Sequence, residues 1–259
     1  MNGHGSRLRI SVVDFLNARP LTWGLLHEPP PGVSVSRDAP SACATKLASG
    51  EADVGLIPSI ECQRIPGLSV VGGLGIAASS EVRSVLLVSD VSRDRIRSVA
   101  LDPASRTSAA LTRILLKRVY GLAPEYRDGS SPVDARLIIG DPALKTRLNG
   151  HVVLDLAAEW RAFTGRSFVF AVWAVRDGAD AELAARAVRA SRARSLSQFP
   201  RLVREGAGET GLSEPVVEDY LRHSLHFELT AEDVGGMELF YRLAAEEGLI
   251  EAPRPLRLI

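Results

Sequence analysis

Short apolar runs alternate along the chain with segments of helical pattern. Each run is rich in Val, Ile, Leu and Ala, and a polar turn leads from it into residues whose apolar positions recur at helical spacing. Gly50 and Gly121 follow two of these segments and are typical helix ends. Strands of nearly continuous apolar residues that alternate with helices indicate a parallel sheet covered on both faces. There are five such runs, each followed by its helical segment: residues 8–14 and 20–26, 32–40 and 41–50, 52–57 and 58–65, 96–102 and 108–121, and 135–141 and 142–150.

Two long β-type runs, residues 81–92 and 167–177, break this alternation. No helical segment directly follows the first, and residues 179–247 are mostly helical in pattern. We interpret the two runs as strands that cross between two α/β lobes, near Val88 and Ala174. Each lobe is expected to hold a mainly parallel sheet flanked by helices, with the second lobe inserted into the first. The predicted lobes are residues 1–87 plus 175–259, and residues 88–174.

The composition is that of an ordinary globular protein. The 259 residues are 46% hydrophobic and 24% charged, and 31 Lys and Arg balance 31 Asp and Glu. A balanced charge predicts neither nucleic acid nor an anionic membrane as partner. Residues 1–13 lack the apolar stretch of a signal peptide, and no membrane-spanning run occurs, so we expect a cytoplasmic protein. The only cysteines, Cys43 and Cys62, are expected to be buried thiols, and a monomer and a homodimer both remain open.

Candidate chemistry lies in four turns after the strands, at residues 14–19, 58–59, 103–108 and 140–142, because ligands bind beyond the carboxyl ends of strands in open parallel sheets. The strongest turn is at residues 102–111, where Ser105, Thr107 and Ser108 surround a helix start together with Arg106. Free backbone N–H groups and the helix dipole make such a start an anion site. Capping of the helix by one of these side chains is the alternative. A cap does not need three hydroxyls and an arginine, so the surplus favours a ligand with a carboxylate.

The other turns give weaker signals. Asp141 before Pro142 is typical of a helix N-cap, although Gly140 would let a ligand approach the backbone closely. Ser59 follows a buried strand, and Ser84 lies inside an apolar run, where a hydroxyl can bond backbone or substrate. No motif indicates a metal or an organic cofactor, and none is expected.

Six segments, in order SVVDFLNARPL, GEADVGLIPSIE, RSVLLVS, ALDPASRTS, LIIGDPAL and FVFAVWAVR, resemble the chorismate dehydratases of the futalosine route to menaquinone. The resemblance spans about residues 8–176 and keeps the family's order and approximate spacing. It implies a two-lobed α/β fold like the type-2 periplasmic binding proteins. It also implies a cofactor-independent lyase that dehydrates chorismate, a small dicarboxylate, to 3-[(1-carboxyvinyl)oxy]benzoate at the start of that route.

In this family the Asn of the first segment is associated with the chemistry, and here it is Asn17. An amide is too weak a base to take the proton, so we expect Asn17 to orient the departing hydroxyl or to stabilise the dienolate. The base is then Asp14 or, as we favour, a carboxylate of the substrate. Arg19 is as consistent with a surface ion pair as with a substrate contact. The predicted substrate-binding residues are Asn17, Arg19, Ser59, Ser84, Ser105, Arg106, Thr107, Ser108, Gly140 and Asp141.

Three alternatives remain open at this point. A non-enzymatic receptor for a small carboxylate would have the same lobes and the same anion site. The sibling 1,4-dihydroxy-6-naphthoate synthase has a similar fold, but its N-terminal block resembles CPNDTF, which this chain lacks. A regulatory sensor domain would usually bring a helix-turn-helix, for which the early first strand leaves no room.

Overall fold

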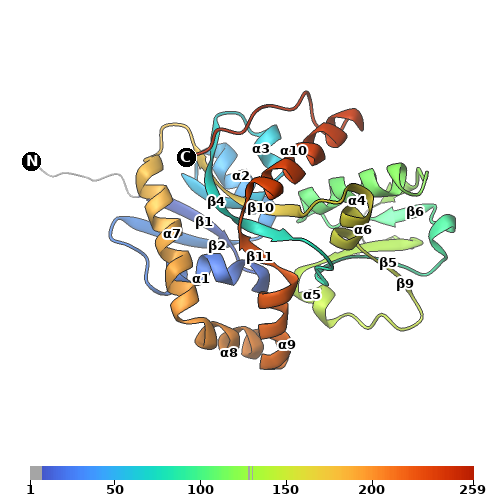
Figure 1. Ribbon diagram of the computed structural model, residues 1–259, viewed down its shortest axis with the longest axis horizontal. Coiled ribbons are helices and arrows are strands. Elements are labelled where there is room, and N and C mark those ends of the chain that lie inside the picture. The colour runs from blue at the N-terminus through green and yellow to red at the C-terminus, as the bar shows by residue number, and fades with distance from the viewer. Residues whose placement is uncertain (1–7, 128, 130) are drawn as a thin grey trace, which may run out of the picture.

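The computed structural model describes residues 8–127, 129 and 131–259, and its two β-sheets lie side by side with helices around each (Figure 1). The first sheet has the strand order β11-β4-β10-β3-β1-β2, and the second has the order β7-β6-β8-β5-β9. The strands of the first sheet are β1 Leu8–Val13, β2 Val33–Asp38, β3 Val54–Pro58, β4 Leu68–Ala78, β10 Phe168–Arg176 and β11 His226–Glu228. Those of the second are β5 Val85–Ser89, β6 Ser98–Ala100, β7 Glu125–Arg127, β8 Ala135–Ile139 and β9 Val152–Asp155.

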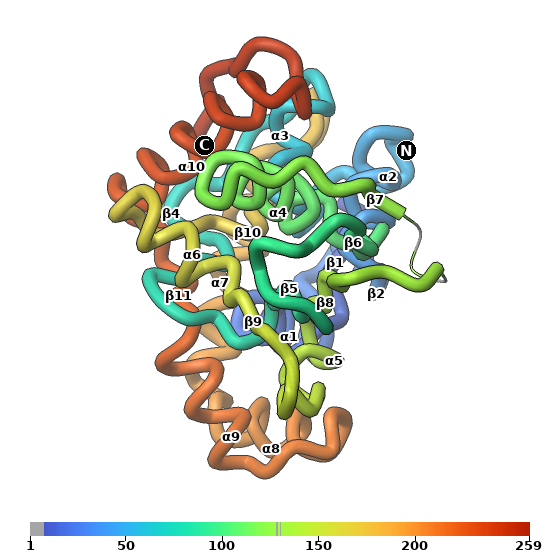
Figure 2. Tube along the Cα trace, turned by 90° about the vertical axis from the view of Figure 1, so that its right-hand side faces the viewer, coloured from blue at the N-terminus to red at the C-terminus, as the bar shows by residue number. Residues whose placement is uncertain are grey.

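The helices are divided between the two sheets in the same way, and Figure 2 shows the second lobe from its outer side. None of the described helices contains a stretch long and apolar enough to cross a membrane. Those of the first lobe are η1 Leu16–Ala18, α1 Arg19–His27, α2 Pro40–Ser49, α3 Glu61–Arg64, α7 Ala181–Ser197, α8 Phe199–Thr210, α9 Glu214–Asp219, the π-helical segment η3 Tyr220–Ser224 and α10 Ala231–Glu246. Those of the second are η2 Arg93–Arg95, α4 Arg106–Arg118, α5 Gly140–Lys145 and α6 Leu156–Thr164.

The predicted two-lobed α/β architecture is confirmed, but both sheets are mixed rather than mainly parallel. Strand β1 runs parallel to β2 and β3, and β6 runs parallel to β7 and β8. In contrast, β10 is antiparallel to β3 and β4, and β5 is antiparallel to β8 and β9. The reason is topological: β5 and β10 are the first strands after each passage between the lobes, and both run against their neighbours.

The sites of passage between the sheets differ from those predicted from the sequence. Val88 lies within β5 and Ala174 lies within β10, and each of these strands belongs to a single sheet. We therefore propose that the chain crosses at residues 79–84 and 165–167 instead. A run of β-type residues in the sequence does not reveal which of two sheets it joins, because both sheets bury the same residue types.

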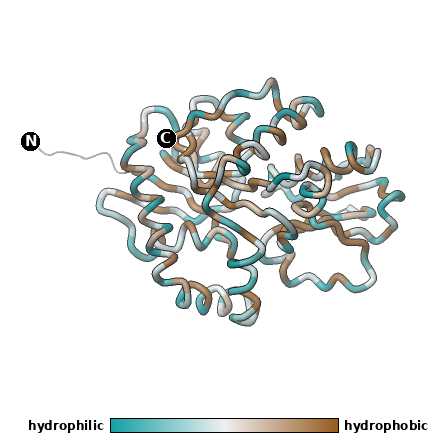
Figure 3. Tube along the Cα trace, in the orientation of Figure 1, coloured by the Kyte–Doolittle hydropathy of each residue, from teal (hydrophilic) through white to brown (hydrophobic). Residues whose placement is uncertain are grey.

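One hydrophobic core extends through both lobes, and hydrophobic residues follow the strands in each (Figure 3). Its aromatic centre joins α6 of the second lobe to β10 and α10 of the first. The ring centroids of Trp160 and Phe168 are 5.3 Å apart, and those of Phe168 and Phe240 are 5.0 Å apart, both edge to face. This shared core fixes one side of the lobe interface. A smaller cluster of Leu86, Val88 and Ala143 joins β5 to α5 in the second lobe.

Local sequence signals set several element boundaries. Gly50 ends α2 with φ +77°, a conformation that glycine adopts without steric cost. Asp155 caps α6 by accepting hydrogen bonds from the amides of Ala157 and Ala158. Thr230 and Asp233 form a reciprocal capping box at the start of α10.

Asp53 links β1, β3 and β10 of the first sheet, directly before the start of β3. Its carboxylate accepts hydrogen bonds from the Arg9 guanidinium at 2.7 and 2.9 Å and from Arg176 Nε at 3.1 Å. Burial alone would raise the pKa of Asp53, but the bonds from Arg9 and Arg176 outweigh it and lower the pKa to about 2.

Asp53→Asn is expected to lower the free energy of unfolding by about 2 kcal/mol at pH 7. The folded pKa lies below the ordinary 3.8, so the carboxylate stabilises the fold above about pH 4, and this contribution is lost between about pH 4 and pH 2. Urea unfolding at pH 7 and at pH 3 measures the deficit, with Glu81→Gln as control, because Glu81 is exposed and has no ion pair among the described residues. An equal deficit at both pH values would contradict the assignment.

Candidate active site

A cavity of about 500 Å³, including its open mouth, lies between the two lobes. The first lobe lines it with Val13, Phe15, Asn17, Pro40, Pro58, Ile76, Phe170 and Ala171. The second lobe lines it with Val85, Ser105, Thr107, Ser108, Ile139 and Gly140. The four turns predicted to hold candidate chemistry each supply at least one of these residues, because the strands before them end at this interface.

A β-bulge shapes one wall of the cavity. In the pairing of β10 with β4, Val169 lies opposite Ala77 and Ala171 lies opposite Ile76, so Phe170 is the additional residue. Successive side chains of a regular strand point to opposite faces. The bulge allows two consecutive residues, Phe170 and Ala171, to face the same cavity.

Asn17 presents an unsatisfied polar atom to this cavity. It lies in the middle of η1, the single 3-10 turn between β1 and α1, and it lines the cavity. Its Oδ1 atom is buried and has no hydrogen-bond partner among the described residues. Leaving a buried acceptor unpaired typically costs about 1–3 kcal/mol. An acceptor kept at this cost is poised to bind a ligand that donates a hydrogen bond.

The start of α4 forms the opposite, polar part of the cavity. Ser105 occupies the N-cap position but makes no side-chain capping bond, so the simple capping alternative is wrong for this residue. Within the described chain, the Ser108 hydroxyl likewise makes no hydrogen bond, and both serines line the cavity. Thr107 differs, because its Oγ1 accepts from the Ile60 amide at 3.2 Å. Two hydroxyls and the unpaired amides of the first turn are therefore available to an anion.

No charged side chain is among the described residues that line the cavity. Apart from Asn17 and the hydroxyl side chains at the start of α4, the described residues of the lining are apolar or Gly140, so no second cluster of donors is present in this lining. In the described part of the chain, no three His, Cys, Asp or Glu side chains gather as a possible metal site. Dipoles and hydroxyls, rather than ionised groups, give the cavity its polarity.

Both arginines predicted to bind substrate are instead held in ion pairs outside the lining. Arg19 is buried and paired with Glu209 of α8. Arg106 pairs with the buried Glu61 at 2.7 Å, a carboxylate that also contacts Arg64 at 3.0 Å. A buried carboxylate needs such partners, which accounts for the position of Arg106 beside Glu61.

Four further candidates do not line the cavity. Ser59 donates to the Val169 carbonyl at 2.7 Å, and Ser84 accepts a hydrogen bond of 2.7 Å from Tyr220. Asp141 accepts from the Leu16 amide at 3.0 Å. Asp14, the possible base, is exposed and lies 3.4 Å from Arg37. These four support neighbouring segments, and the predicted contacts of the first three with substrate stay unconfirmed.

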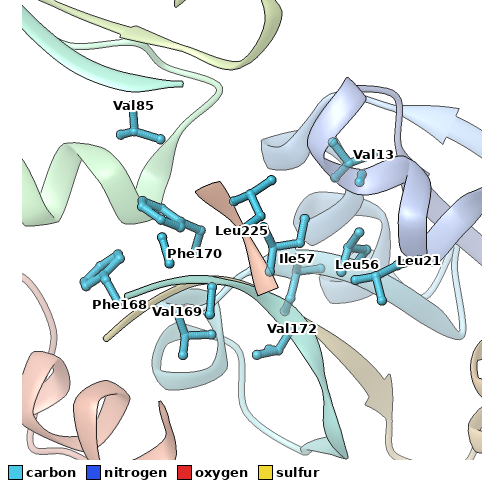
Figure 4. Packing of buried hydrophobic residues seen from close by; sticks show 14 of the residues in the cluster. Val13, Leu21, Leu56, Ile57, Val85, Phe168, Val169, Phe170, Val172 and Leu225 are labelled. Atoms are coloured by element: carbon cyan, nitrogen blue, oxygen red, sulfur yellow. The ribbon is translucent and has the colours of Figure 1, made fainter. Parts of the chain in front are cut away.

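The apolar walls of the cavity are the part that reasoning from the sequence missed. Phe15 and Phe170 contribute aromatic rings, and Val85 faces them from the second lobe. In Figure 4, Phe170 lies between Val85 and Leu225. Apolar residues at strand ends have the same pattern as core residues. Only the position of Phe15, two residues before Asn17, could have indicated that Phe15 lines the cavity.

A family model described as menaquinone biosynthesis matches residues 8–246. The chain belongs to this family. It is also 28% identical over 251 residues to a chorismate dehydratase of Thermus thermophilus, covering 87% of this chain and 91% of that protein. A chorismate dehydratase of Campylobacter jejuni is 32% identical over 165 residues, which are 61% of this chain and 63% of that protein. The resemblance noted from the six segments is confirmed at the level of the family.

Solved structures show the same fold in proteins of low sequence identity. Protein AF1704 of Archaeoglobus fulgidus has a TM-score of 0.77 and 15% identity, covering 95% of this chain and all of that one. The periplasmic aliphatic sulphonate binding protein SsuA of Escherichia coli has a TM-score of 0.64 and 20% identity, covering 97% and 90%. The predicted periplasmic-binding-protein-like fold of this menaquinone-biosynthesis family member is therefore confirmed.

Proposed function

We propose that this protein is a cytoplasmic chorismate dehydratase, a carbon–oxygen lyase of the futalosine route that converts chorismate to 3-[(1-carboxyvinyl)oxy]benzoate and water. The observation that carries the proposal is the cavity itself. It sets the unpaired Asn17 oxygen across from a helix start with free hydroxyls, and apolar side chains form the remaining walls. The identity of the substrate is inferred from the names of the relatives, which are chorismate dehydratases.

In this proposal one carboxylate of chorismate binds at the start of α4. The hydroxyls of Ser105 and Ser108 donate hydrogen bonds to it, and the amides of the first helical turn supply further donors. The ring of the substrate lies against Phe15 and Phe170. The apolar walls suit the ring throughout the reaction, because they favour the aromatic ring of the product as much as the diene ring of the substrate.

The proposed step is an elimination across C3 and C4 of the ring. The C3–H bond breaks, its proton goes to the base, and the electron pair is delocalised through the diene onto the ring carboxylate. The C4–O bond then breaks, the departing hydroxide takes up the proton that the base had accepted and leaves as water, and the ring becomes aromatic. Asn17 accepts a hydrogen bond from the C4 hydroxyl through Oδ1 and can donate through Nδ2 to the departing oxygen.

The proposed base is a carboxylate of the substrate, as favoured from the sequence. Asp14 is a poor alternative, since it is exposed, contacts Arg37 and is absent from the lining. The lining contains no His, Glu, Lys or Cys among the described residues. Positioning of the reacting groups then supplies the main catalytic effect, which reaches about 7–11 kcal/mol in well-oriented systems.

The direct test is incubation of the purified full chain with chorismate, followed by chromatography with mass and ultraviolet detection. We expect a product lighter by one water with an aromatic spectrum, and no product with chorismate alone. Calorimetric binding of chorismate without turnover would overturn the enzymatic proposal. It would favour a binding protein, which is the function named for the structurally similar sulphonate-binding protein.

A further inference from the structure

The turn that carries Asn17 receives its N-terminal cap from the other lobe. Residues Leu16–Ala18 form η1, and Phe15 at its N-cap position makes no capping bond through its side chain. The first amide of the turn, that of Leu16, instead donates to Asp141 Oδ1 at 3.0 Å. Asp141 lies 125 positions further along the chain, on α5 of the second lobe.

The approach of Asp141 to this turn depends on Gly140. Gly140 has φ +64°, and its amide donates to the Ser84 carbonyl at 2.8 Å. A Cβ atom at position 140 would lie 3.2–3.4 Å from ring atoms of Phe15. The second lobe therefore contacts the Asn17 turn at two adjacent points, the Phe15 ring and the Leu16 amide.

Asp141 does not serve the purpose predicted for it from the sequence. It is not the N-cap of α5, a position held by Ile139, and it does not line the cavity. Burial raises its pKa, and the bond from Leu16 opposes this shift. Among the described residues its carboxylate has no ion pair within 4 Å, so the Leu16 amide is the main compensation for its burial.

We propose that Asp141 is a positioning residue whose carboxylate holds the Leu16–Ala18 turn in place when the lobes are in contact. Because Asn17 is the central residue of this turn, Asp141 fixes the amide that acts on the substrate without touching the substrate. This inference rests on the proposed dehydratase function. It makes contact between the lobes a requirement for turnover, and not only for enclosure of the ligand.

The test compares Asp141→Ala, which removes the acceptor, with Asp141→Asn, which retains Oδ1. Asp134→Ala is the matched control, because Asp134 accepts the Arg97 and Ser98 amides at 2.8 Å within the second lobe alone. We expect Asp141→Ala to lower kcat for chorismate about tenfold, because a turn that has lost its capping acceptor holds Asn17 in the productive position less often, with KM changed less than about threefold. Asp141→Asn should restore kcat to within about threefold of wild type.

Amide exchange at Leu16, followed by nuclear magnetic resonance without substrate, gives a second readout that does not require turnover. Exchange should be about tenfold faster in Asp141→Ala and unchanged in Asp134→Ala. Unchanged Leu16 exchange in folded Asp141→Ala, or a raised KM with unchanged kcat, would overturn the inference. Inactive wild type would refute the dehydratase proposal alone, and Leu16 exchange would still decide whether Asp141 holds the turn.

Discussion

Asn17→Ala is expected to lower kcat for chorismate by about 100- to 1,000-fold while KM changes little. This is the usual loss when one preorganised polar group that acts on a developing charge is removed. The Asn17 oxygen has no hydrogen-bond partner among the residues that the structure describes, so its truncation does not break a bond between them. The effect should therefore appear in turnover, with little effect on thermal unfolding.

Asn17→Asp provides the more discriminating comparison. The change preserves the shape of the side chain but replaces the Nδ2 donor with a negative charge in a cavity otherwise lined by uncharged residues. We expect weaker binding of the dianionic substrate as well as slower turnover, since like charges in a desolvated site repel.

Steady-state kinetics with chorismate and calorimetric binding of the product measure the two effects of the Asn17 variants separately. Asn149→Ala, in an exposed loop of the second lobe, is the matched control and should leave both unchanged. A fully active Asn17→Asp protein would show that the amide has no part in the reaction. If each variant unfolds at the same temperature as the wild type, a loss of fold is excluded as the cause of its lower activity.

The sequence predicted the location of the site better than it predicted the residues around it. The rule that ligands bind beyond the carboxyl ends of parallel strands selected four turns, and each of them supplies at least one residue to the same cavity. It could not distinguish side chains that reach the cavity from those that turn away. Ser105 and Ser59 both follow strands, yet only Ser105 lines the cavity, because the Ser59 hydroxyl is satisfied by a carbonyl of β10.

Charged residues were the least predictable part of the site. Arg19 and Arg106 stand in the right turns, and their types suit a carboxylate ligand. Their partners, Glu209 and Glu61, come from segments that only the tertiary fold brings near. The bond from Leu16 to Asp141 is hidden for the same reason, since it joins two lobes whose relative placement no local pattern encodes.

The mixed sheets show a similar limit. Apolar runs alternating with helices favour parallel pairing, and β1, β2 and β3 obey that rule. The same β-rich composition also describes β10, which enters from the other lobe and pairs antiparallel on both sides. Periodicity reports burial of a strand but not its direction, so the direction of the returning strand had to come from the structure.

The double variant Ser105→Ala/Ser108→Ala is expected to raise KM for chorismate about 100-fold while kcat falls much less. Each hydroxyl can donate to the bound carboxylate, and a hydrogen bond to a charged group contributes about 1.5–3 kcal/mol. The lower end applies to each serine, since water can enter the space left by a small side chain. Each single variant should then raise KM about tenfold, and the two effects should roughly multiply.

Calorimetric binding of the product 3-[(1-carboxyvinyl)oxy]benzoate to these variants isolates the effect on affinity. Ser213→Ala is the matched control, because Ser213 also occupies an N-cap position without a capping bond but starts the remote helix α9. The serine pair should weaken product binding, whereas Asn17→Ala should leave it nearly unchanged. Equal losses of affinity in both would mean that the α4 start and Asn17 hold the same group. In that case, binding and chemistry would not be divided between the two lobes that line the cavity.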